Sequence, residues 1–116
     1  MKKADVEPKL AEIMNTIPEC EGLIAVDPKG KVIVGQTIDE SMDHAAIAKA
    51  VQGIVKGATG AAELVKKNGT TDVTVSYNDG FIQVVVEDTG MIIGLMGSDG
   101  RNSLSLLMRN MKTVLK

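Results

Sequence analysis

Residues 39–67 read DESMDHAAIAKAVQGIVKGATGAAELVKK, and this stretch decides the fold. Its apolar side chains recur at alternating steps of four and three residues, which is the spacing of one face of an α-helix. We therefore predict a helix from Asp39 to Lys67, about 40 Å long at ~1.5 Å per residue. A small domain needs less than this length for its own core, so part of the helix should face another molecule. The predicted apolar stripe comprises Ile47, Val51, Ile54, Ala58, Ala61 and Val65.

The two ends of this helix carry recognisable signals. Asp39 or Ser41 is expected to cap the start, because their side-chain oxygens accept hydrogen bonds from the free N–H groups of a first turn. Basic residues at 66–67, followed by Asn68-Gly69, indicate the end.

A row of small residues runs along the same helix. Each glycine inside a helix costs roughly 0.5–1 kcal/mol relative to alanine, so several in one row indicate that another element must approach closely. That element is either the helix of a second copy or the protein's own sheet, since small residues serve both contacts. The row consists of Ala50, Gly53, Gly57 and Gly60.

Polar side chains form a further stripe on the side opposite the apolar one. A mixed-charge helix face usually serves only to keep a protein solvated. The alternative is that this stripe contacts a protein partner. Its members are Lys49, Gln52, Lys56, Thr59 and Glu63.

The remainder of the chain alternates between helical and strand-like patterns. Apolar residues between 6 and 17 predict a first helix that Asp5 caps, with Pro8 in its first turn. A last helix follows residues 98–100 and is expected to be capped by Asn102 or Ser103. Strands are predicted at 23–26, 31–35, 72–77, 81–87 and 91–96, with turns at 27–30 and 78–80.

This order, α-β-β-α-β-β-β-α, predicts one domain over residues 1–116 with a five-stranded antiparallel sheet. Residues 91–96 (MIIGLM) are apolar on both faces, so they should form a central strand that is covered on both sides. We expect the long helix on one face and the two terminal helices on the other. The predicted fold class is therefore a three-layer α/β/α domain.

The predicted strand from Asp72 to Tyr77 has an unusual composition if it lies at the edge of the sheet. Natural edge strands are usually blunted by charge or proline, and here only Asp72 is charged. Val73, Val75 and Tyr77 share one face. We expect this edge to pair with a second copy of the chain; the alternative is a plain edge protected by its short length.

Composition excludes several classes of function. The chain has 116 residues and a net charge of −2, which argues against a general nucleic-acid binder. Cys20 is the single cysteine, so neither an intrachain disulfide nor a cysteine-based metal cluster can form, and no cofactor is expected. No window approaches the ~20 apolar residues of a membrane span, and no apolar run follows Met1. We expect a soluble cytoplasmic protein that does not insert into membranes.

Two other kinds of site are considered. Cys20 and His44 are the one candidate thiol–imidazole pair, although neither stands in a recognisable catalytic context. The sequence Gly57-Ala58-Thr59-Gly60 matches the GxxG loop of KH domains, but the apolar periodicity continues through it. A small-ligand or KH-like nucleic-acid-binding module is thus the alternative function.

Taken together, these features resemble the Roadblock / dynein light chain domain family. The resemblance covers most of the chain: the hairpin IPECEGLIAVDPKGKVI (17–33), the alanine-rich long helix, the hairpin DVTVSYNDGFIQVVV (72–86), and a glycine-turned last strand before a leucine-rich helix. It implies a profilin-like fold and, in most members, no catalytic activity.

The resemblance also implies partners. Family members form homodimers or heterodimers, with the long helices side by side and the sheets joined at the first strand of the meander. They regulate or scaffold small Ras-like GTPases, and bacterial relatives stimulate GTP hydrolysis. Carried over to this chain, the implied partners are a second copy or a paralogous chain and a GTPase. The implied dimer contacts are Ala50, Gly53, Gly57, Gly60, Val73, Val75 and Tyr77, and the candidate GTPase-facing residues are Lys49, Gln52, Lys56, Thr59 and Glu63.

Overall fold

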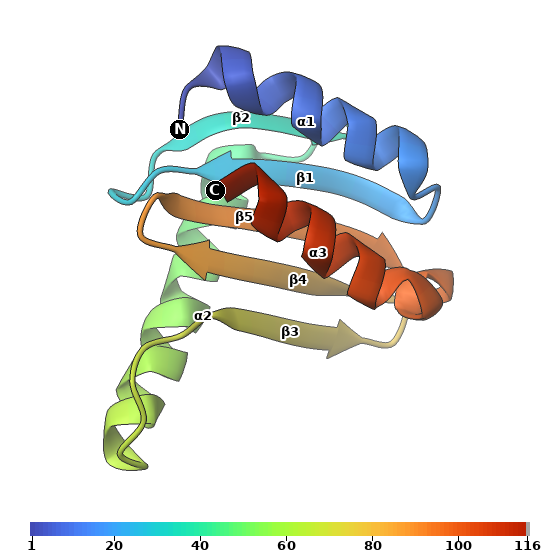
Figure 1. The fold of residues 1–116 in the computed structure, drawn as a ribbon. Helices are drawn as coiled ribbons and strands as arrows, with labels where there is room; N and C mark the ends of the chain where they lie inside the picture. The colour runs from blue at the N-terminus through green and yellow to red at the C-terminus, as the bar shows by residue number, and fades with distance from the viewer. Residues whose placement is uncertain (116) are drawn as a thin grey trace.

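The computed structural model describes residues 1–115, and its elements follow the predicted order (Figure 1). One short 3-10 helix, η1, is added before the last helix. The elements are α1 (Lys3–Thr16), β1 (Cys20–Val26), β2 (Val32–Thr37), α2 (His44–Leu64), β3 (Asp72–Tyr77), β4 (Gly80–Glu87), β5 (Gly90–Gly97), η1 (Ser98–Ser103) and α3 (Leu104–Leu115).

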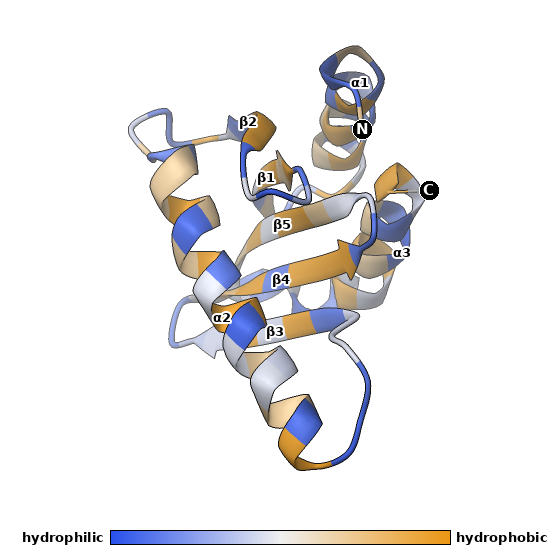
Figure 2. Ribbon diagram, turned by 90° about the vertical axis from the view of Figure 1, so that its left-hand side faces the viewer, coloured by the Kyte–Doolittle hydropathy of each residue, from blue (hydrophilic) through white to orange (hydrophobic). Residues whose placement is uncertain are grey.

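The five strands form one sheet in the order β2-β1-β5-β4-β3, and every neighbouring pair is antiparallel. Helices α1 and α3 cover one face and α2 lies on the other (Figures 1 and 2). The predicted three-layer α/β/α architecture is confirmed. Strand β5 is central, and Ile92 and Ile93, which point to opposite faces, are both fully buried.

Two hydrophobic clusters, one on each face, hold these layers together. The larger cluster lies under α1 and α3 and includes Leu10, Leu23, Ile92, Leu107 and Met111. The smaller cluster lies under α2 and includes Ile24, Ala48, Val51, Val84 and Ile93. Helix α2 therefore contributes less to the core of its own chain than its length suggests.

Helix α2 begins later than its sequence predicted, because a different aspartate caps it. Oδ1 of Asp43 accepts a hydrogen bond from the N–H of Ala46 at 3.1 Å, which makes Asp43 the N-cap. Asp39 instead accepts from the N–H and O–H of Ser41, at 2.9 and 2.6 Å. These bonds stabilise the carboxylate and lower the pKa of Asp39. The predicted cap was wrong because a local turn uses Asp39 first.

Helix α2 also ends earlier than expected, at Leu64, with Val65 as the C-cap. Lys66 adopts a φ of 61°, the left-handed conformation that often ends a helix. The observed helix has 21 residues and is about 31 Å long. Neither α2 nor another helix within residues 1–115 is long and apolar enough to cross a membrane.

The sheet is narrower than α2 is long. Five strands spaced ~4.8 Å apart are roughly 19 Å wide, so α2 extends past β3 (Figure 1). Ala48 and Val51 are its buried side chains, with Ile47 and Val55 packed against the same cluster. The predicted apolar stripe was wrong in its last turns: Ala61 is exposed, and Val65 is 64% exposed.

Two other helix starts differ from expectation. Helix α1 begins at Lys3, so Asp5 lies inside it and Pro8 falls in the second turn. Asn102 and Ser103, the predicted caps of α3, belong to η1. Oγ of Ser103 instead donates to Oε2 of Glu19 at 3.3 Å, which ties η1 to the segment before β1.

Candidate interaction surface

The glycine row of α2 does not face the sheet of its own chain. A Cβ placed on Gly53, Gly57 or Gly60 would meet no atom within 4 Å among the described residues, the helix's own backbone apart. Ala50 is exposed as well. The explanation that these glycines let α2 sit close on its own sheet is therefore wrong. The row is a smooth, open strip of helix surface.

The predicted polar stripe is divided by the structure. Thr59 is half-buried, and its Oγ1 is 2.7 Å from Oγ1 of Thr70, in the connection to β3. Gln52 is also half-buried and lies over Gly30 in the turn between β1 and β2. Lys49, Lys56 and Glu63 are exposed. Two of the five residues thus fasten α2 to its own chain, and three remain free for a partner.

The two stripes lie on adjacent, overlapping faces of α2. Successive helical residues turn by about 100°, which places Ala50 about 160° from Gln52 and about 120° from Lys56, whereas Gly53 and Gly60 lie within about 60° of Lys56. Because Gln52 lies over Gly30, the Lys56 flank faces the β1–β2 turn. The glycine row lies on the side of α2 away from the buried Ala48 and Val51, so it faces outward.

Strand β3 lies at the edge of the sheet, as the family resemblance implied. Within residues 1–115, β4 is the one strand paired with it. Val73 and Val75 are half-buried and Tyr77 is 50% exposed. The edge therefore carries both unpaired backbone groups and apolar side chains.

Part of the sheet beside this edge is covered incompletely. The strand register places Val75 beside Ile82, and Ile82 beside Leu95, so these three side chains form a continuous row across β3, β4 and β5. We call this row, Val75, Ile82 and Leu95, the open row; all three are half-buried. Val84 and Ile93, two residues along the same strands and on the same face, are fully buried. Figure 2 shows the reason, since α2 crosses the sheet obliquely and leaves one end of this face bare.

The far end of α2 exposes large apolar side chains beyond the sheet. Leu64 is 86% exposed, the highest value among the exposed large hydrophobic residues between 1 and 115. Val65, the next residue in the chain, is 64% exposed. Leu64 was not predicted to be a surface residue from the sequence. Its exposure could have been predicted from helical spacing, because Leu64 lies outside the apolar stripe and on the same face as the glycine row.

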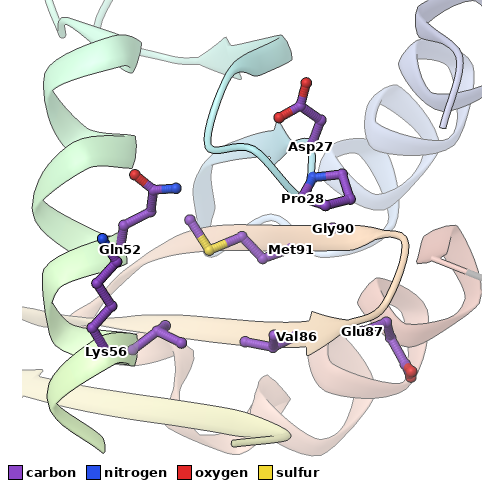
Figure 3. A pocket seen from close by; sticks show the side chains of 9 residues that line it. Asp27, Pro28, Gln52, Lys56, Val86, Glu87, Gly90 and Met91 are labelled. Atoms are coloured by element: carbon purple, nitrogen blue, oxygen red, sulfur yellow. The ribbon is translucent and has the colours of Figure 1, made fainter. Parts of the chain in front are cut away.

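A small pocket lies on the other flank of α2 (Figure 3). It has a volume of about 230 Å³ and lies between α2, the β1–β2 turn and the β4–β5 turn. Val55, Val86 and Met91 give it an apolar lining, and Gln52 and Lys56 stand on its helix side. Three separate parts of the chain build it, so sequence patterns within one element could not reveal it.

Two alternative sites are not assembled by the structure. Cys20 belongs to the cluster under α1 and α3, whereas His44 lies on the α2 face, against Gly35. A nucleophile and a base on opposite faces of a sheet cannot act together. Gly57-Ala58-Thr59-Gly60 lies inside α2 and forms no loop, so it cannot clamp a nucleic-acid backbone as a KH loop does.

Comparison with solved structures identifies the fold. Myxococcus xanthus MglB aligns with a TM-score of 0.82 over 97% of this chain and 84% of its own, at 15% sequence identity. A Roadblock/LC7 domain from Streptomyces avermitilis aligns with a TM-score of 0.81 over 96% of this chain and 92% of its own, at 14% identity. The chain has the Roadblock/LC7 fold. The Roadblock fold predicted from the hairpins and the long helix is thus confirmed.

A third Roadblock structure, described as MglB with tetrameric arrangement, aligns with a TM-score of 0.70 at 12% identity, over 96% of this chain and 93% of its own. Scans against protein-family models and against curated proteins find no match. The likeness to Roadblock proteins therefore lies in the fold, at 12–15% identity in these three cases.

Proposed function

We propose that this protein is a non-catalytic, homodimeric Roadblock-type regulator or scaffold of a small Ras-like GTPase. The observation that carries the proposal is the arrangement of three open surfaces around β3. These are the edge of β3, the open row beside it, and the end of α2 that extends past it. Each exposes apolar groups that a second copy would cover.

One two-fold arrangement covers all three surfaces. If β3 of two copies pair in antiparallel fashion, the two sheets become continuous and the unpaired backbone groups of both edges are satisfied. Helix α2 of each copy then extends past its own β3 and lies over the other copy's sheet. It covers the part of that sheet which the other copy's α2 leaves bare. Val65 would reach the partner's open row and Leu64 would face the partner's α2, while the glycine rows would allow the two helices to approach closely.

A Ras-like GTPase is the proposed partner of the dimer. Support comes from the Roadblock fold together with the sequence resemblance to a family that serves such GTPases. Lys49, Lys56 and Glu63 are exposed in one chain, and in the proposed dimer they stay accessible. We assign the GTPase contact to the flank that carries them, with Gln52 and Thr59 holding it in place. A paralogous chain could replace the second copy at the same surfaces.

The first test is the mass in solution, measured by light scattering on a sizing column at micromolar concentration. We expect about twice the 12.2 kDa of one chain. A clean monomer would contradict the homodimer and would direct the search to a paralogous partner chain.

The second test uses the purified protein as bait for Ras-like GTPases from the same genome. Each GTPase is loaded with GDP or with a non-hydrolysable GTP analogue. We expect retention of one GTPase in one nucleotide state, and hydrolysis assays then separate a regulator from a scaffold. Failure of every GTPase to bind an intact dimer in either state would overturn the proposal.

A further inference from the structure

We propose that the pocket beside α2 anchors one apolar side chain that has a carboxylate next to it, both presented by a protein partner. The pocket is the one lined by Gln52, Val55, Lys56, Val86 and Met91, with Pro28 at its edge. This inference rests on the proposed function and deepens it, since it names the chemistry that the partner brings to the exposed flank of α2.

The size and lining of the pocket suit a single side chain. A volume of about 230 Å³ equals the share of seven or eight waters at ~30 Å³ each, which is room for one leucine or phenylalanine side chain. Val55, Val86 and Met91 give this side chain apolar contacts. In protein interfaces, a few anchors that fill such pockets carry most of the binding energy.

The charges around the pocket favour an acidic group beside the anchor. Figure 3 shows Lys56 and Gln52 together on the helix side, with Met91 reaching toward them. The carboxylates of Asp27 and Glu87 point away from the centre of the pocket (Figure 3). Lys56, whose side chain is exposed, can therefore donate to a partner's carboxylate.

The carboxylate of Asp27 is moreover engaged within its own turn. Its Oδ1 accepts the N–H groups of Lys29 and Lys31, both at 2.9 Å. The backbone N–H of Gly30 donates to the carbonyl oxygen of Asp27 at 3.0 Å. These bonds hold the β1–β2 turn in place, so Asp27 shapes the wall of the pocket and its Oδ1 is used within the turn.

The pocket is formed before any partner arrives. The β1–β2 turn is hydrogen-bonded, and the side chain of Gln52 lies against Gly30 of that turn. Binding to a preformed pocket loses little conformational entropy. Gln52 and Val55 of the pocket lie on the side of α2 opposite Ala50 and Gly57, so the pocket stays open in the proposed dimer.

The test is selection from a random heptapeptide display library on the immobilised wild-type protein, with counter-selection on Lys56→Glu. We expect enriched peptides to carry a large apolar residue within two positions of Asp or Glu. Synthetic copies of these peptides, measured by fluorescence polarisation, should bind Lys56→Glu at least about tenfold more weakly, since an attractive charge becomes repulsive. Lys3→Glu, an exposed lysine of α1 on the other face of the sheet, should bind like wild type. Replacing the apolar residue of the peptide with serine should also abolish binding.

Several outcomes would overturn the inference. One is enrichment of basic peptides or of no peptide at all. Another is equal binding of the selected peptides to wild type and to Lys56→Glu. A third is loss of the dimer mass in Lys56→Glu, because that result would assign the pocket to the second copy. The proposed function can fail separately. If acidic–apolar peptides are enriched but no GTPase binds the dimer, the pocket stands and the GTPase is wrong. If a GTPase binds wild type and Lys56→Glu equally, the pocket inference is wrong and the proposed function stands.

Discussion

The imidazole ring of His44 lies directly against the backbone of Gly35. A Cβ on Gly35 would stand 2.5 Å from Nδ1 of this ring, closer than real side chains approach. Nε2 of the same ring is 3.0 Å from Oγ1 of Thr37. Oγ1 of Thr37 donates its proton to the carbonyl oxygen of Asp39 at 2.9 Å, so Nε2 of His44 must donate to Thr37. The first turn of α2 is thereby fastened to β2.

This contact predicts that Gly35→Ala destabilises the protein by about 1–3 kcal/mol, as overpacking does elsewhere. The added methyl group must displace the ring and break its bond to Thr37. Urea denaturation measures the loss. The double variant Gly35→Ala/His44→Ala should be less destabilised than the sum of the two single variants, because the clash has gone. Additive losses would show that the ring is not the obstacle.

The N-cap of α2 leads to a second prediction. Asp43→Ala removes the acceptor of the Ala46 N–H, and we expect a loss of about 1 kcal/mol in the free energy of unfolding. Glu40→Ala is the matched control, because Glu40 is an exposed carboxylate in the same connection that makes no cap. Equal stability of Asp43→Ala and wild type would contradict the assignment of this cap.

The start of α2 also shows where sequence reasoning stops. Asp39, Ser41 and Asp43 all precede the helix, and each is a good cap by residue type. Asp39 and Ser41 bond to each other, which leaves Asp43 to cap the helix. Competition between neighbouring hydrogen bonds decides which residue caps α2. The order of residue types in the sequence does not reveal how this competition ends.

The strands were easier to predict than the surface of α2. Alternation gave Asp72–Tyr77 with its observed bounds, and the apolar run at 91–96 predicted the central strand. On α2, however, Val51 packs in the core while Val65 lies beyond the sheet, although both have the same periodicity. An apolar stripe has the same spacing whether the protein itself or a partner covers it. Only the width of the sheet separates the two cases.

The buried thiol of Cys20 leads to a prediction about pH. Burial raises the pKa of Cys20 above the ordinary 9.0, so the folded protein holds the thiol proton more tightly than the unfolded chain. The contribution of this thiol to stability is complete while the pH is below the ordinary cysteine pKa. It is lost as the pH rises above that pKa toward the higher pKa of Cys20 in the folded protein. Stability should therefore fall at alkaline pH by more in wild type than in Cys20→Ala, as denaturation curves across this range will measure.

The same burial predicts slow chemistry at neutral pH. Sγ of Cys20 donates to the carbonyl oxygen of Gly22 at 3.4 Å, inside the cluster under α1 and α3. Iodoacetamide should modify the native protein far more slowly than the urea-unfolded chain, because the thiolate is scarce and shielded. Rapid alkylation of the native protein would contradict the buried position of this side chain.

The last prediction concerns the glycine row and separates folding from assembly. In one chain, a side chain on Gly57 points into open space, so Gly57→Leu should fold normally and gain some helix propensity. In the proposed dimer, the same leucine would push the two α2 helices apart. We expect a monomer by light scattering, with a circular dichroism spectrum like that of wild type. Ala45→Leu, an equally exposed small-to-large change in the first turn of the same helix, should remain dimeric. A dimeric Gly57→Leu would remove the glycine row from the interface and would leave the β3 edge and Leu64 as the surfaces to test next.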